Sequence, residues 1–162
     1  MQELADAFNA TFENTKSVFL DLYGYDCPHL APQNRKRVRT HFGKPYTQVI
    51  DAIAGSDLYI MNSTEEGFGL VLLEAMLNRV PWAARPIAGA RRMADRGFTY
   101  TDISDLMKYL TSFVDKTKTT SWDRDTQLKL DDNRNFVLKS MSIRNTCDDI
   151  EVVLSQAQAL VP

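Results

Sequence analysis

One stretch constrains the fold of this chain more than any other. It is an apolar strand at 57–61, a turn with two glycines, and an apolar helix that begins near Leu70. A strand, a glycine-containing turn and a helix together aim backbone N–H groups at an anion on the helix N-terminus. Gly67 and Gly69 have no Cβ, so the backbone can approach a ligand closely. Glu74 lies among apolar neighbours, and a buried glutamate needs a partner or a nearby pocket. The stretch therefore predicts a ligand site at the end of a strand.

The rest of the chain alternates between strand and helix patterns. We predict strands at 17–23, 35–42, 57–61, 81–84 and 97–100. We predict helices at 2–14, at 46–54, from Asp102 as the N-cap, around 136–141, and at 147–157. Loops are expected at 24–34, 86–90 and 116–121. This alternation indicates an α/β fold with a doubly wound parallel sheet and C-terminal helices, in a single domain over 1–162.

The composition excludes several classes of protein. Of the 162 residues 44% are hydrophobic, which is enough for a core, and the net charge of -2 gives no general reason to bind nucleic acid or an anionic membrane. No apolar run has the length of a membrane span. Cys27 and Cys147 match no metal or redox spacing, and the acidic N-terminus lacks the apolar region of a signal peptide. We expect a cytoplasmic protein.

The sequence contains no recognisable metal or hydrolase motif. His29 and His41 are the only histidines, and neither has a ligand partner at close spacing, so we expect no metal site. No nucleophile-elbow sequence supports a serine hydrolase. The basic run at 35–42 is interpreted as a solvated edge rather than a phosphate patch.

The stretch from Glu66 to Glu74 resembles a known signature. Its sequence, Glu-Gly-Phe-Gly-Leu-Val-Leu-Leu-Glu, is similar to the Glu-x7-Glu motif of the retaining glycosyltransferases of family 4, and the similarity continues through Ala75-Met76 and Val80-Pro81. The resemblance implies the C-terminal, donor-binding half of a GT-B enzyme, which is Rossmann-like. It also implies a nucleotide-sugar donor (UDP-, GDP- or ADP-linked) as substrate, with no cofactor and no metal.

The resemblance also assigns roles to single residues. Glu66, the catalytic candidate, would contact donor-sugar hydroxyls, and Glu74 would accept hydrogen bonds from both ribose hydroxyls. Backbone N–H groups after Gly67 would meet the diphosphate and stabilise it as the leaving group. The donor-binding residues are then Glu66, Gly67, Phe68, Gly69, Leu70 and Glu74, and those in the vicinity of the base are Phe42, Gly43 and Lys44.

The chain departs from the family pattern in three places. Arg92 stands where the loop after the fourth strand usually has a glutamate. The basic loop that holds the diphosphate has no counterpart, and neither does the acceptor-binding half. We therefore expect an acceptor-half protein from another chain, a missing segment or a homo-oligomer to complete the enzyme. The alternatives are a non-catalytic nucleotide-sugar-binding module and a structural interaction module.

One further expectation concerns the sheet itself. In the resembling fold a first strand lies between the strands at 17–23 and 57–61, and this chain has none in its place. Unpaired strand edges are costly when buried and sticky when exposed. We expect the two strands either to pair directly or to accept a strand from another chain.

Overall fold

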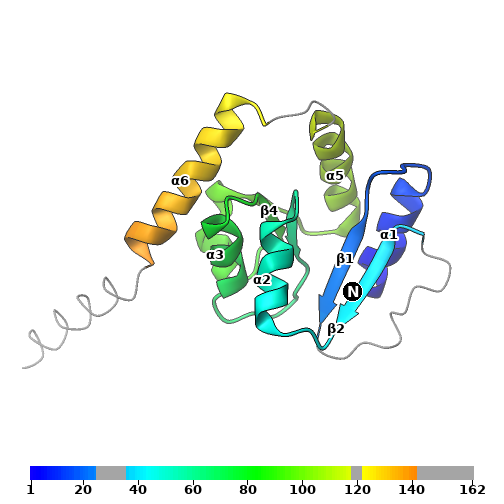
Figure 1. The fold of residues 1–162 in the computed structure, drawn as a ribbon, viewed down its shortest axis with the longest axis horizontal. Helices are drawn as coiled ribbons and strands as arrows, with labels where there is room; N and C mark the ends of the chain where they lie inside the picture. The colour runs from blue at the N-terminus through cyan, green and yellow to red at the C-terminus, as the bar shows by residue number, and fades with distance from the viewer. Residues whose placement is uncertain (25–35, 118–121, 142–162) are drawn as a thin grey trace, which may run out of the picture.

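The computed structural model describes residues 1–24, 36–117 and 122–141, in which helices and strands alternate along the chain (Figure 1). The strands are β1 (Leu20–Gly24), β2 (Val38–Phe42), β3 (Tyr59–Met61), β4 (Trp82–Ala84) and β5 (Phe98–Thr99). The helices are α1 (Gln2–Phe12), α2 (Tyr46–Ala54), α3 (Leu70–Leu77), α4 (Ala88–Arg92), the 3-10 turn η2 (Ala94–Arg96), α5 (Ile103–Thr117) and α6 (Arg124–Ser140). The α/β prediction is confirmed.

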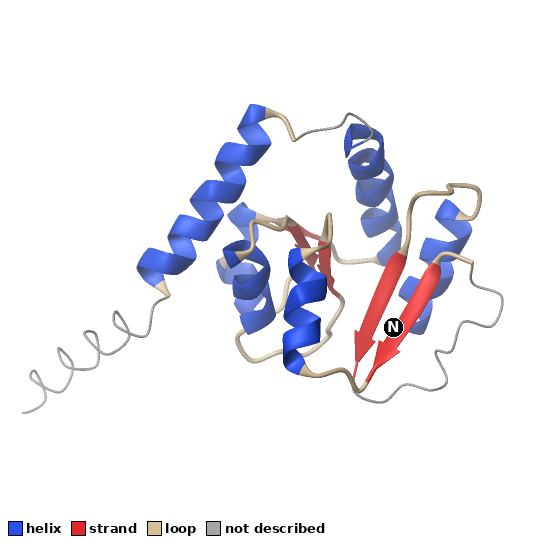
Figure 2. Ribbon diagram, viewed as in Figure 1, coloured by secondary structure: helices blue, strands red, loops and turns tan. Residues whose placement is uncertain are grey.

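All strand pairs in the described residues are parallel, but they form two sheets rather than one. β1 pairs with β2, from Leu20 opposite Val38 onward, and β3, β4 and β5 form a separate three-stranded sheet. Figure 2 shows the two sheets apart. No hydrogen-bonded ladder joins β1 to β3 in the part of the chain that the structure describes, so direct pairing of these strands was the wrong alternative.

Helix boundaries follow from capping residues in the sequence. Asp102 accepts a hydrogen bond from the Asp105 N–H at 2.9 Å, which confirms it as the cap of α5. Asp123 accepts one from the Thr126 N–H at 2.7 Å and starts α6. α6 begins well before the predicted helix at 136–141, because most of its first half is polar and gives little apolar periodicity.

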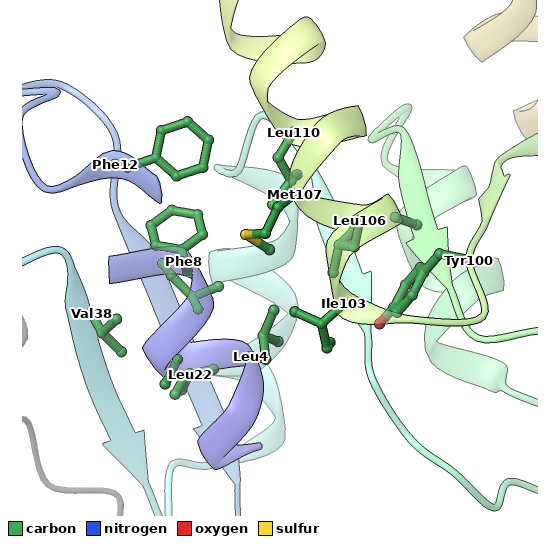
Figure 3. Close-up of a cluster of buried hydrophobic side chains, with 13 residues drawn as sticks. Leu4, Phe8, Phe12, Leu22, Val38, Tyr100, Ile103, Leu106, Met107 and Leu110 are labelled. Carbon is green, nitrogen blue, oxygen red and sulfur yellow. The ribbon is translucent and has the colours of Figure 1, made fainter. Parts of the chain in front are cut away.

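Two main hydrophobic cores hold the elements together. In the first, one face of α1 packs against one face of α5 and onto β1 and β2 (Figure 3). Leu58 and Ile60 pack against this same cluster, so the three-stranded sheet shares it with the two-stranded one. The second core surrounds the fully buried Trp82 and joins α3, α4 and α6 to β3 and β4.

Some predicted elements differ from the observed ones. The region 86–90, predicted as a loop, contains the start of α4, and β1, β2 and β3 each begin a few residues later than predicted. The predicted loop at 24–34 lies almost entirely, and the helix at 147–157 wholly, outside the described residues. No described helix combines the length and the apolar character that crossing a membrane requires.

Candidate functional site

The predicted ligand stretch occupies the loop 62–69 and helix α3, at the carboxyl end of β3. Gly69 has φ +76°, in the left-handed region that favours glycine because a side chain is strained there. Its carbonyl accepts a hydrogen bond from the Leu72 N–H at 2.9 Å. Gly67 is exposed, and a Cβ there would meet nothing within 4 Å. The backbone conformation of the loop is therefore constrained at Gly69, whereas Gly67 has free space where a side chain would lie.

Helix α4 lies directly against the backbone of this loop. A Cβ built on Gly89 would lie 1.6 Å from the carbonyl oxygen of Phe68. Only a residue without a side chain permits this approach. The Phe68 ring packs against the core around Trp82, so side chain and backbone are both held. The sequence predicts only a loop at 86–90 and gives Gly89 no role of its own.

A polar cluster holds the other end of the loop. The Asn62 side-chain oxygen accepts hydrogen bonds from Arg85 Nε at 3.0 Å and from the Tyr100 hydroxyl at 2.9 Å. Arg85 also donates to the Thr101 carbonyl at 2.9 Å. Burial raises the pKa of Tyr100 to about 12, against the opposing effect of the Arg85 charge, so its hydroxyl remains a donor. The loop is thus tied to β4 and β5 at its start.

The two glutamates of the motif lie in different surroundings. Glu66 is exposed on the loop, whereas Glu74 is half-buried on α3. Both carboxylates nevertheless act on the same side chain of β3: burial, together with the negative charges of Glu66 and Glu74, raises the pKa of Tyr59 to about 12. The structure therefore brings the two predicted acidic residues to one end of the three-stranded sheet.

Glu74 has a partner that the sequence did not reveal. The Tyr46 hydroxyl, from the first residue of α2, donates a hydrogen bond to Glu74 Oε1. The other oxygen, Oε2, is buried and has no hydrogen-bond partner. Although Tyr46 is a large aromatic residue, 66% of it is exposed. Its place directly after Pro45, at the helix start, is the signal that could have set it apart.

The residues predicted near the base run from Phe42, the last residue of β2, to Lys44, shortly before α2. Phe42 is half-buried, and Gly43 and Lys44 are exposed. Gly43 has φ +62°, and its N–H donates to the Gly24 carbonyl at 3.0 Å. Because Tyr46 comes shortly after Lys44 and contacts Glu74, this segment is linked to the motif through α2.

The basic strand β2 makes local pairs. Arg39 and His41 contact the two carboxylate oxygens of Asp21, at 2.5 and 2.7 Å, and the His41 ring stacks on Tyr23. Arg37 donates to the carbonyls of Lys16 and Glu13. These pairs fit a solvated edge.

No metal-binding arrangement occurs among the described residues, which contain no group of three or more His, Cys, Asp or Glu side chains placed to hold an ion. Two shallow surface hollows are present along β5 and α5, and no residue of the motif lines them.

Comparisons with known proteins agree with this fold. The family described as Glycosyl transferases group 1 matches residues 4–120. No curated protein sequence matches. Among 39 chains of solved structures that match, the crystal structure of a GtfA/B complex has 17% sequence identity and a TM-score of 0.58. It covers 83% of this chain, and the chain covers 30% of it. The family match extends over most of the sequence, and the chain therefore belongs to the group 1 glycosyltransferases.

Proposed function

We propose that this chain is the donor-binding half of a retaining glycosyltransferase of family 4 that uses a nucleoside-diphosphate sugar. The observation that carries the proposal is the carboxylate of Glu74. One of its oxygens is buried without a hydrogen-bond partner, one turn into the helix that Gly69 begins. A buried unpaired carboxylate oxygen is costly, and a ribose hydroxyl would satisfy it.

The remaining roles follow the order of the donor's parts along the motif. Glu66, exposed on the loop, would accept hydrogen bonds from the sugar hydroxyls. The N–H groups of Phe68, Gly69 and Leu70 would face the diphosphate, where they stabilise the negative charge that develops as the sugar leaves. Phe42, Gly43 and Lys44 would lie near the base. These roles need no resident metal.

In this proposal, a partner supplies the acceptor-binding side of the site for glycosyl transfer. The chain spans about 30% of the length of the matched GtfA/B structure, which is described as a complex. β1 and β3 share a hydrophobic core but are not paired with each other in the described residues. We propose that an acceptor-half protein or a second copy provides the opposing wall, and that a strand from it fits between these two edges.

One observation favours a second candidate function. α4 ends in Arg91 and Arg92, so a positively charged side chain stands where the corresponding loop of family 4 usually has a glutamate. A module that binds a nucleotide sugar without turnover would tolerate this change.

Calorimetric titration with UDP-, GDP- and ADP-sugars tests the proposal. We expect at least one donor to bind with a roughly millimolar Kd, since these residues form only the donor-binding side of the proposed site. Glu74→Gln should remove this binding. The proposal is wrong if none of the donors binds at millimolar concentration.

An assay for release of sugar from the bound donor separates the two candidates. Slow hydrolysis that Glu66→Gln abolishes supports an enzyme, and NMR of the released sugar reports whether its anomeric configuration is retained. Binding without any release, also after an acceptor-half protein is added, supports the module.

A further inference from the structure

The contact between Tyr46 and Glu74 occurs where the proposed function places the nucleoside. Tyr46 reaches from the start of α2 to α3, and its hydroxyl donates to Glu74 Oε1. The other oxygen of the same carboxylate is buried and unpaired. One oxygen of the Glu74 carboxylate therefore accepts a hydrogen bond from Tyr46, and the other oxygen accepts none.

The phenol of Tyr46 offers Glu74 what a sugar hydroxyl offers, a single O–H donor to a carboxylate. The hydrogen bond to Glu74 raises the pKa of Tyr46, so the hydroxyl keeps its proton at neutral pH. With 66% of the residue exposed, little packing holds the ring in place. A change of its χ1 rotamer would move the hydroxyl away, at the cost of its hydrogen bond to Glu74.

We propose that Tyr46 competes with the nucleoside for Glu74 and thereby weakens, by a similar factor, the binding of every ligand that reaches Oε1. This inference rests on the proposed function, and it adds a residue that the resemblance does not assign. A ligand must displace the Tyr46 hydroxyl to reach Oε1. A ligand with one hydroxyl only exchanges one hydrogen bond for another, whereas a vicinal diol replaces that bond and also satisfies Oε2. The competition therefore lowers the affinity for ribonucleotides and deoxyribonucleotides alike, and the preference for the diol comes from the second hydrogen bond, to Oε2.

Tyr46→Phe tests the competition, because it removes the hydroxyl and keeps the ring. Calorimetry with UDP, GDP, ADP and their 2′-deoxy analogues should show about three- to tenfold tighter binding by Tyr46→Phe, on the order of one net hydrogen bond. The tightening should be similar for the ribo and deoxy forms. Tyr109→Phe is the matched control: Tyr109 stacks on Phe98, far along the chain from the motif, and its loss of a hydroxyl should leave binding unchanged.

NMR of the wild-type chain labelled with ¹³C at the tyrosine rings gives a second readout. The Tyr46 signal is identified by its absence in Tyr46→Phe. It should shift saturably as nucleotide is added, as the bond to Glu74 breaks, and should not shift with inorganic phosphate.

Equal or weaker nucleotide binding by Tyr46→Phe would overturn the competition, as would a Tyr46 signal that stays unchanged while the nucleotide saturates. If neither the wild type nor Tyr46→Phe binds any nucleotide, the proposed function itself fails, and the role of Tyr46 fails with it. The two failures are therefore distinguished by whether the wild type binds.

Discussion

The loop after β3 and the loop after β2 both lead from the carboxyl end of a strand into a helix, yet they are held very differently. The loop at 62–69 is clamped by Arg85 at its start and by the contact of Gly89 with the Phe68 carbonyl near its end. The loop at 43–45 is exposed throughout. Its Gly43 N–H donates to the neighbouring strand at 3.0 Å.

The difference fits two separate roles within the proposed sugar-donor site. N–H groups that stabilise a developing negative charge act best when they are fixed before the reaction, and the clamped loop would fix those near Gly69. A loop with few buried contacts adapts more easily, which suits the side proposed for the base. Tyr46 connects the two regions, because it follows the exposed loop and contacts α3.

The largest expected effect comes from Gly89→Ala, which disrupts the close contact between α4 and the loop at 62–69. The added Cβ would lie 1.6 Å from the Phe68 carbonyl oxygen, so α4 or the loop must move. We expect a loss of roughly 2–4 kcal/mol in the free energy of unfolding. Nucleotide binding should disappear with it. Urea unfolding and calorimetry measure the two effects.

Gly67→Ala is the matched control in the same loop, since a Cβ there meets nothing within 4 Å. Its unfolding free energy should stay within about 0.5 kcal/mol of the wild type. Equal stability of the Gly67 and Gly89 variants would show that the clamp does not exist.

The next prediction distinguishes the proposed ligand-binding roles of Glu74 and Glu66. Glu74→Gln should weaken nucleotide binding at least tenfold, roughly 1.4 kcal/mol or more, because the amide cannot replace the charged acceptor. Glu66→Gln should leave the affinity for a nucleoside diphosphate unchanged and weaken only that for the nucleotide sugar. Calorimetry with both ligands checks this, and an equal loss for both variants would contradict the assigned order of sugar and ribose.

A smaller effect is expected for Arg85→Met, which removes the hydrogen bonds to Asn62 and Thr101. We expect a loss of about 1–2 kcal/mol in unfolding free energy. Lys44→Met, in the exposed loop, should change stability by less than about 0.5 kcal/mol. Thermal melts of both variants measure these losses of stability. A larger loss for Lys44→Met than for Arg85→Met would contradict the conclusion that the loop at 62–69 is the more firmly held of the two.

The smallest effect concerns Asp21, on the strand beside the exposed loop. Burial alone would raise its pKa, but hydrogen bonds from Arg39 and His41 and their positive charges lower it below its usual 3.8. A carboxylate with a lowered folded pKa adds stability above its unfolded pKa, and this stability is lost as the pH falls through the folded value. Since the cluster is partly exposed, the contribution should be below about 1 kcal/mol.

Urea unfolding of the wild type and Asp21→Asn between pH 3 and pH 6 measures this contribution. The stability difference between them should shrink toward the acid end. A difference that is constant over this range would show that the Asp21 cluster does not stabilise the fold through its charge.

The sequence was sufficient for those features that depend on local chemistry. Alternating periodicity predicted the α/β fold, and Asp102 predicted the start of α5. The glycine-containing turn and the apolar run after it predicted a helix that begins near Leu70, where α3 begins. Features that depend on which distant segments pack together could not be predicted from the sequence. The bond from Tyr46 to Glu74 joins residues 28 positions apart. The approach of Gly89 to Phe68 likewise depends on where α4 packs.

Backbone amide chemical shifts test the central claim most directly. The uniformly ¹⁵N-labelled chain is titrated with the nucleoside diphosphate that binds best, with inorganic phosphate at equal ionic strength as the control. The account predicts saturable shifts that are largest at the amides of Phe68, Gly69 and Leu70, with smaller ones toward Gly43, and their loss in Glu74→Gln. Largest shifts elsewhere in the fold, or no saturable shift at millimolar nucleotide, would contradict it.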